Sequence, residues 1–320
     1  MSSPILLGKE GNSLREEFGK ELVKIAKSNK KILVLDADIA GGTGAHHFRK
    51  IFKNRFIQCG IAEQNMISVS AGLSSMGFIP IVTTFAVFLI RGIEQVRLSI
   101  AYSNLNVKLI GSHVGLDVGP DGASAQSLED IAIFRSLPNF TILVPSDPID
   151  TKILIKKAIE IKGPVYMRTG RSPSQQYLNA SYKVEIGKPN VIVKGSDLVI
   201  FACGPLVYQS LLASKEVSKI GISVELINVN TIKPIDKKFI VNHSKKKLAV
   251  ITAEDHNIIG GLGSTIAEIL SNLHPKPIYF VGVKDIFGQS GEPNILYQKY
   301  QLDYKSIVNL LKNIYEKYKK

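Results

Sequence analysis

Tryptophan is absent from this sequence of 320 residues, and cysteine occurs only twice, at Cys59 and Cys203. The two cysteines lie far apart without a CxxC spacing, so neither a disulfide framework nor a structural zinc site is indicated. No stretch approaches the roughly 18 uninterrupted apolar residues of a membrane span, and residues 1–8 lack the basic start and the length of a signal peptide. We therefore expect a cytoplasmic protein that makes no contact with a membrane.

Acidic residues are also in deficit. Lys and Arg number 40 against 27 Asp and Glu, which gives a net charge of +13 and an isoelectric point near 9.5. The excess is mostly dispersed lysine, and the only compact basic run is residues 245–247. We expect no nucleic-acid partner, because no basic-aromatic recognition motif accompanies the charge. A positive field is compatible with phosphorylated small molecules as ligands.

Short β-branched runs alternate with amphipathic stretches along the chain, a rhythm typical of βαβ units and parallel sheets. A polar passage at 181–190 interrupts this rhythm before a second series begins. The predicted strands are 32–36, 79–83, 107–111, 141–144, 165–168, 198–202, 224–228, 248–253 and 278–283. The predicted helices of the first series are 13–28, 62–76, 93–101, 128–135 and 148–161. The expected fold class is α/β, with two parallel-sheet domains at 13–184 and 185–320 that follow an N-terminal arm at 1–12.

Residues 60–66, Gly-Ile-Ala-Glu-Gln-Asn-Met, place the acid Glu63 in the first turn of a predicted helix. About twenty residues later, Phe85 and Phe88 stand three positions apart at the end of the next predicted strand. A carboxylate beside two ring faces suits a flat heteroaromatic cofactor that needs a proton at a ring nitrogen and a stacking surface. Taken singly, Glu63 could complement the helix dipole, and the two rings could be ordinary core.

Five further motifs follow in order, at residues 115–122, 128–132, 144–147, 254–263 and 285–293. Together with residues 60–66, this series resembles the C-terminal section of the transketolase family of thiamine diphosphate enzymes. The resemblance extends over about residues 13–303, nearly the whole chain. It implies that residues 13–184 form a pyrimidine-binding domain and residues 185–320 a transketolase C-terminal domain.

Full-length transketolases also have a diphosphate-binding domain with a Gly-Asp-Gly motif that helps to hold magnesium, and no Gly-Asp-Gly occurs in this sequence. The chain offers no candidate set of oxygen ligands for magnesium. The resemblance therefore implies a split enzyme, in which a separate N-terminal subunit supplies the metal and diphosphate site. We expect thiamine diphosphate to lie between the chains of an α2β2 assembly.

The resemblance also assigns roles to residues at the cofactor. A glutamate at the position of Glu63 shares a proton with the pyrimidine ring nitrogen, and a buried carboxyl group suits this role. Phe85 and Phe88 match aromatic residues that flank the pyrimidine. Asp38 and Ile39 match the neighbouring loop. A third family aromatic is replaced by Arg91 in this sequence.

For the substrate, an aspartate at the position of Asp121 would hydrogen-bond a sugar hydroxyl, although the turn-forming sequence around it offers a structural explanation. Residues that resemble phosphate ligands are Arg15, His113, and an arginine of the pair Arg168 and Arg171. Arg15 could instead be a solvated residue at a helix start, and His113 a satisfied histidine at a strand end. No spacing among the remaining histidines predicts a metal site.

Two departures from the family pattern concern the substrate. Ala125 stands where the family has a histidine close to the reacting sugar, and Gly42 lies near the position of a phosphate-binding serine. The resemblance thus predicts transfer of a two-carbon ketol unit from a ketose to an aldose, with an unusual or modified sugar. Two alternatives stay open, the beta subunit of a 2-oxoacid dehydrogenase and a non-catalytic paralogous subunit.

Overall fold

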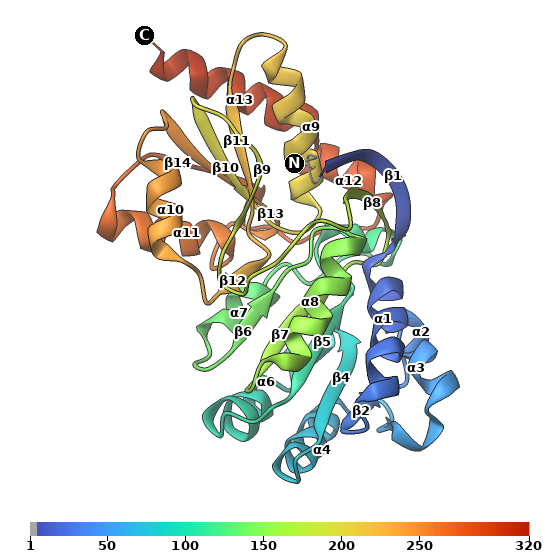
Figure 1. Ribbon diagram of the computed structural model, residues 1–320. Coiled ribbons are helices and arrows are strands. Elements are labelled where there is room, and N and C mark those ends of the chain that lie inside the picture. Colours follow the sequence, from blue (N-terminus) through green and yellow to red (C-terminus); the bar gives the residue numbers. More distant parts are fainter. Residues whose placement is uncertain (1–4, 320) are drawn as a thin grey trace.

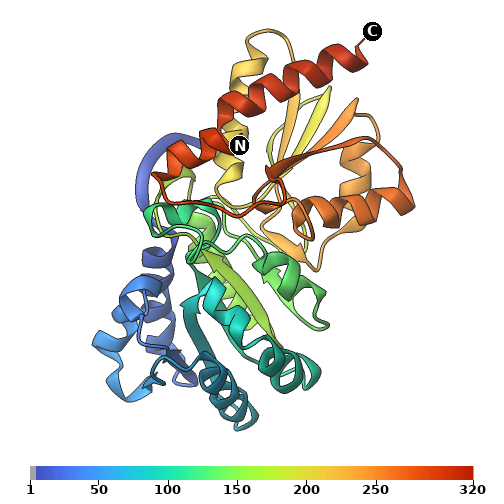
Figure 2. The ribbon, with the colours of Figure 1, turned by 180° about the vertical axis from the view of Figure 1, so that it is seen from behind.

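The computed structural model describes residues 5–319 and shows two α/β lobes stacked end to end (Figures 1 and 2). Each lobe contains one mainly parallel sheet, and this confirms the predicted fold class. Within residues 5–319, none of the helices is both long enough and apolar enough to cross a membrane.

The sheet of the first lobe has seven strands in the order β12-β6-β7-β5-β4-β2-β3. Neighbouring strands are parallel except that β12 is antiparallel to β6. The bounds of these strands are β2 Ile32–Asp36, β3 Phe56–Gln58, β4 Ile79–Phe85, β5 Lys108–Ser112, β6 Thr141–Leu143, β7 Val165–Thr169 and β12 Thr231–Lys233. Because β12 belongs to the second half of the chain, the second series contributes an edge strand to the first sheet.

The sheet of the second lobe has the order β14-β13-β10-β11-β9, and only β9 is antiparallel to its neighbour. Its strands are β9 Asn190–Val193, β10 Leu198–Ala202, β11 Val224–Asn228, β13 Ala249–Asn257 and β14 Ile278–Val283. A two-stranded antiparallel ribbon, β1 Ile5–Ser13 with β8 Pro173–Leu178, lies at the junction of the lobes (Figure 1). Most of the predicted arm at 1–12 is therefore strand β1, while residues 1–4 lie outside the described residues.

Helices cover both sheets (Figure 1). In the first lobe they are α1 Leu14–Ser28, α2 Ala40–Thr43, α3 His46–Ile51, α4 Glu63–Ser75, α5 Ala86–Arg91, α6 Ile93–Gln95, α7 Asp130–Ser136 and α8 Pro148–Glu160, with 3-10 turns at Lys53–Arg55 and Leu116–Asp121. In the second lobe they are α9 Leu206–Ser218, α10 Lys237–Ser244, α11 Leu262–Leu273, α12 Pro293–Lys299 and α13 Tyr304–Tyr318. The helix predicted at 93–101 is present, but it begins as α6 and continues as a π-helix at Val96–Tyr102. Nine residues are too few for apolar periodicity to separate the two windings.

The central strands are buried on both faces, as covered parallel sheets require. Successive side chains of a strand point to opposite faces, and two hydrophobic clusters follow this alternation. Val34 and Ile200 belong to one cluster, whereas their neighbours Leu35 and Phe201 belong to the other. Each cluster contains residues from both lobes, so the two lobes share continuous apolar packing.

Candidate functional site

Glu63 is the first residue of α4, as predicted, and its side chain is only 3% exposed. Its Oε2 atom is buried and has no hydrogen-bond partner among the described residues. The nearest cation is Arg91, whose Nη1 lies 3.7 Å from Oε2 at the exposed end of α5. An unsatisfied buried polar atom costs about 1–3 kcal/mol. Such an atom in a native fold calls for an explanation, and a ligand group is one.

Phe85 and Phe88 stack on each other at the strand end where they were predicted. Phe85 closes β4 and Phe88 lies in α5, with ring centroids 5.3 Å apart and planes 15° apart. Helix α5 also carries Arg91, so one short helix connects the aromatic pair to Glu63. Phe85 also stacks on His113 at a centroid distance of 3.6 Å.

The loop that contains Asp38 and Ile39 is tied to the turn before Glu63. Gln58 Oε1 accepts hydrogen bonds from the backbone N–H groups of both Asp38 and Gly60. Ile39 N–H donates to the carboxylate of Asp36 at the end of β2. No local pattern in the sequence points to Gln58, which connects Asp38 with Gly60, 22 residues later in the chain.

Gly42 lies in the short helix α2 that follows this loop, and its backbone comes close to the Phe85 ring. A Cβ atom at Gly42 would lie 2.7 Å from the Phe85 ring, so glycine permits the close approach. Arg15, in the first turn of α1, donates from Nη1 to the carbonyl of Gly42 at 3.0 Å. Arg15, which the sequence predicted to bind a phosphate group, therefore contacts the segment that was predicted to border the cofactor.

His113, Asp121 and Arg171 form the next part of the site. Nε2 of His113 lies 3.8 Å from Asp121 Oδ2, and Nη2 of Arg171 lies 3.5 Å from Asp121 Oδ1. Burial, followed by the charges of Arg15 and Arg171, lowers the pKa of His113 to about 3. This imidazole is therefore neutral at physiological pH, and the two arginines supply the positive charge. His113 also has a φ of 56°, a conformation that is rare outside glycine and concentrates at functional positions.

Arg168 lies elsewhere, so the structure separates the predicted arginine pair. Its guanidinium contacts the buried carboxylate of Asp130 twice, from Nε at 2.7 Å and from Nη2 at 2.8 Å. Its remaining donors reach the carbonyls of Ser127 and Asp255. Every guanidinium nitrogen of Arg168 therefore has a partner outside the candidate site, whereas Arg171 contacts Asp121.

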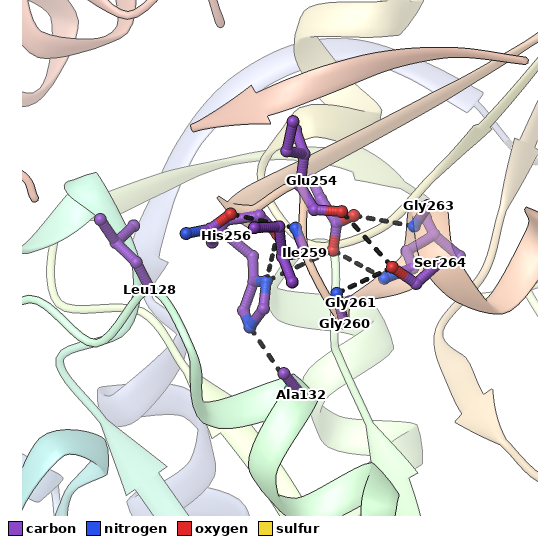
Figure 3. A network of polar contacts seen from close by, with 12 residues as sticks. Leu128, Ala132, Glu254, His256, Ile259, Gly260, Gly261, Gly263 and Ser264 are labelled. Carbon is purple, nitrogen blue, oxygen red and sulfur yellow. Dashed lines mark hydrogen bonds and ion pairs between the residues drawn. The ribbon is translucent and has the colours of Figure 1, made fainter. Parts of the chain in front are cut away.

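The motif at 254–263 also forms contacts between the lobes rather than part of the site (Figure 3). Both carboxylate oxygens of Glu254 accept backbone N–H groups at the start of α11, from Leu262 and Gly263. His256 Nε2 accepts the N–H of Ala132 in α7 of the first lobe. The neighbouring Asp255 accepts the N–H of Leu116 and the hydroxyl of Tyr297. We call Asp130, Arg168, Glu254, Asp255 and Tyr297 the junction network.

Ala125 lies in the loop that this junction holds. The adjacent Gln126 donates from Nε2 to the carbonyl of Gln289 at 3.0 Å, which connects the loop to the motif at 285–293. Ala125 itself is buried. Ala125, which stands where the family has a histidine, therefore lies in a loop that is held by contacts with the second lobe.

A cavity of about 590 Å³ lies at the junction of the lobes, and its lining includes Asp117, Arg168, Asp255 and Tyr297. Glu63, Phe85 and Phe88 do not line it. The candidate site is instead formed by residues of the first lobe. Three Asp, Glu, Arg or Lys side chains in the described part of the chain have a buried atom without a hydrogen-bond partner, namely Arg15, Asp36 and Glu63. Arg15 and Glu63 belong to the candidate site, and Asp36 accepts the N–H of Ile39 beside it.

Comparison with known proteins places each lobe in a family. Residues 10–175 match the transketolase pyrimidine-binding domain, and residues 187–307 match the transketolase C-terminal domain. A transketolase C-terminal section from Methanocaldococcus jannaschii is 42% identical over 311 residues, covering 96% of each chain. A 6-deoxy-6-sulfo-D-fructose transketolase subunit of Clostridium sp. strain MSTE9 is 36% identical over 318 residues, covering 99% of each chain. A solved structure described as a split-gene transketolase, an inactive β4 tetramer, has a TM-score of 0.89 at 42% identity and covers 96% of this chain and 99% of its own.

Proposed function

Because the chain belongs to the transketolase family, as the C-terminal section of a split member, we propose that it forms half of an enzyme that transfers a two-carbon ketol unit from a ketose to an aldose. The observation that carries this proposal is the buried Oε2 of Glu63, which has no hydrogen-bond partner within residues 5–319, on a segment that α5 connects to the stacked pair Phe85 and Phe88. The two relatives above that match the chain nearly end to end are named as a transketolase C-terminal section and a transketolase subunit.

The residues of the site fit thiamine diphosphate. Glu63 offers a carboxyl oxygen that can share a proton with a ring nitrogen, and Phe85 and Phe88 offer a face for offset stacking, worth about 0.5–1.5 kcal/mol beyond burial. The loop with Asp38 and Ile39 would border the same ring. When bound, the cofactor supplies the carbon nucleophile for cleavage of a carbon–carbon bond. The task of Glu63 is to hold the proton, and that of the aromatic pair is to orient the ring and exclude water.

We propose that Arg15, Arg171 and the neutral His113 bind an anionic group of the sugar, while Asp121 accepts a hydrogen bond from a hydroxyl. Guanidinium groups recognise tetrahedral oxyanions, which include phosphate and sulfonate. The Clostridium relative is named for a sulfonated sugar. Together with Gly42 and Ala125, that similarity supports a modified sugar as substrate.

A separate N-terminal subunit completes this site in our proposal and provides the magnesium ligands, within an α2β2 assembly. Buried atoms of Arg15, Asp36 and Glu63 have no hydrogen-bond partner within residues 5–319, as expected where a cofactor and a second chain complete the site. The solved relative in its β4 form is described as inactive, which supports the need for a partner chain.

The test is reconstitution of the chain with its N-terminal partner, which we expect to be encoded in an adjacent reading frame. Two-carbon transfer should require both chains, thiamine diphosphate and magnesium. Rates with xylulose 5-phosphate are compared with those for sulfonated, non-phosphorylated and nucleotide-linked sugars. Activity only with the pentose phosphate would end the modified-sugar proposal. Turnover of a 2-oxoacid with an artificial electron acceptor, without ketol transfer, would favour the 2-oxoacid dehydrogenase alternative.

A further inference from the structure

Two imidazoles and one carboxylate meet on the first lobe, close to the candidate site. Glu16 lies in the first turn of α1, and His46 and His47 begin α3. One ligand atom from each side chain lies within 4.8 Å of the other two. The sequence spacing did not predict this cluster, because Glu16 stands thirty residues before the histidines.

The helices that carry the three side chains are in direct backbone contact. A Cβ atom at Gly19 would lie 2.1 Å from the carbonyl oxygen of Gly44, and a Cβ at Gly44 would lie 2.1 Å from that of Arg15. Both views of the ribbon show the helices of this region grouped at the outer edge of the first lobe (Figures 1 and 2). Since the backbones touch, the positions of the three side chains are fixed by a rigid scaffold, as a binding site requires.

The distances in the cluster are close to those of a metal centre. Nε2 of His47 lies 2.8 Å from Oε2 of Glu16, and the rings of His46 and His47 have centroids 4.0 Å apart. Zinc binds nitrogen and oxygen ligands at about 2.0–2.2 Å, so tetrahedral ligand atoms lie about 3.4 Å apart. The three ligand atoms, which all lie within 4.8 Å of one another, are thus near the separation that a bound ion requires.

The electrostatics also favour a cation. Nδ1 of His46 is buried and has no hydrogen-bond partner among residues 5–319. The cluster thus offers a carboxylate and an imidazole nitrogen that has no other partner.

We propose that Glu16, His46 and His47 bind a divalent transition-metal ion, for which zinc is the experimental probe. Imidazole nitrogen selects zinc, copper, nickel or cobalt over magnesium and calcium, which prefer oxygen ligands. Three protein ligands leave a fourth position for water. This site is separate from the magnesium site that we assign to the partner subunit.

The proposed ion would fasten two segments of the candidate site. Helix α1 carries Arg15, and helix α2, just before α3, carries Gly42, whose carbonyl accepts the hydrogen bond from Arg15. A metal that joins Glu16 to His46 and His47 therefore holds both sides of this contact. Zinc should raise the unfolding temperature of the chain, because a ligand that binds only the folded state stabilises it.

The test uses the full chain without an affinity tag, stripped of metals by chelation and dialysis. Calorimetric titration with zinc should give one ion per chain, and excess magnesium should not compete. His46→Ala, His47→Ala and the conservative Glu16→Gln should each weaken zinc binding by about ten-fold or more. Cobalt(II) should give a visible absorption spectrum that the same variants lose.

His243→Ala is the matched control. His243 also pairs with a carboxylate, with Nδ1 3.1 Å from Glu225 Oε1, but it belongs to no three-residue cluster in the described chain. This variant should bind zinc like the unaltered chain. Failure of the unaltered chain to bind zinc overturns the proposal, as does equal zinc binding by the unaltered chain and the folded Glu16→Gln variant. Loss of binding in His243→Ala to the same extent would place the metal elsewhere and also overturn it.

Discussion

The junction network and the candidate site both bury charge, but they differ in how completely that charge is paired. In the junction network, every guanidinium nitrogen of Arg168 and both carboxylate oxygens of Asp130, Glu254 and Asp255 have hydrogen-bond partners. In the candidate site, Glu63 has a buried oxygen without one.

We use this difference to distinguish charged side chains that stabilise the fold from charged side chains that bind a ligand or partner. Each network lies where parallel strands end, and each contains family motifs, so position and motif alone do not distinguish them. A fully paired buried network fixes the arrangement of the lobes, because breaking any pair leaves a desolvated charge. A partly paired network keeps a desolvation cost, and binding of a ligand or partner chain is one way to offset it.

The largest effect is expected at Glu63. In the reconstituted enzyme, Glu63→Gln should lower two-carbon transfer by about 10²–10⁴-fold, the usual contribution of a positioned proton-transfer group. Its stability should not fall, because no hydrogen bond to Oε2 is lost. Turnover and urea unfolding are measured in parallel, with the exposed Glu94→Gln as the control. Wild-type turnover in Glu63→Gln would remove the catalytic role.

The two arginines of the predicted pair give the next test. Arg168→Met should destabilise the fold by about 3–5 kcal/mol, since Asp130 would stay buried without its partner. Arg171→Met should cost at most about 1 kcal/mol, because its contact with Asp121 is partly exposed. Urea unfolding of both variants measures the difference. Equal stabilities would show that the junction network does not hold the fold.

The pH dependence of stability should be unusual for buried carboxylates. Burial, above all, raises the pKa values of Asp150 and Asp255 from 3.8 to about 6. Folding therefore favours the protonated forms, and their contribution to stability grows as pH falls from about 6 towards 4. A shift of this size corresponds to on the order of 3 kcal/mol for one group.

Urea unfolding at pH 7, 6 and 5 checks this direction. Carboxylates with lowered pKa values, such as Glu17 and Glu21, lose their stabilising effect only at lower pH. His113 opposes the gain, because burial lowers its pKa to about 3 and the unfolded chain binds a proton at this imidazole below about pH 6.5. The profiles are therefore compared in a His113→Asn background. Asp255→Asn carries no titrating group and should flatten part of the profile. Stability that falls steadily from pH 7 to pH 5 would contradict the prediction.

The sequence predicted those parts of the fold and the site that local pattern determines. The position of Glu63 at a helix start and of Phe85 at a strand end follows from neighbouring residues, and both predictions are confirmed as structure. The different positions of Arg168 and Arg171 depend on Asp130, thirty-eight residues before Arg168. Strand β12 joins a sheet whose other strands lie much earlier in the chain. Such contacts leave no periodic or local signal, so single-sequence reasoning could not find them.

The smallest effect is expected at Gly41 and Gly42, two adjacent glycines of helix α2. A Cβ at Gly42 would lie 2.7 Å from the Phe85 ring, whereas a Cβ at Gly41 would have nothing within 4 Å. Gly42→Ser should therefore cost about 1–2 kcal/mol through overpacking, and it should weaken cofactor binding by displacing Phe85. Gly41→Ser is the matched control and should change neither quantity.

Urea unfolding and thiamine diphosphate titration of the reconstituted pair measure both effects of Gly42→Ser. Because Phe85 occupies the space beside Gly42, a serine at this position cannot simply restore the phosphate contact of other transketolases. If Gly42→Ser instead improved turnover of xylulose 5-phosphate without loss of stability, the Phe85 ring would have to be movable. The proposal that the candidate site accepts a modified sugar would then fail, while the proposed role of Glu63 would not be affected.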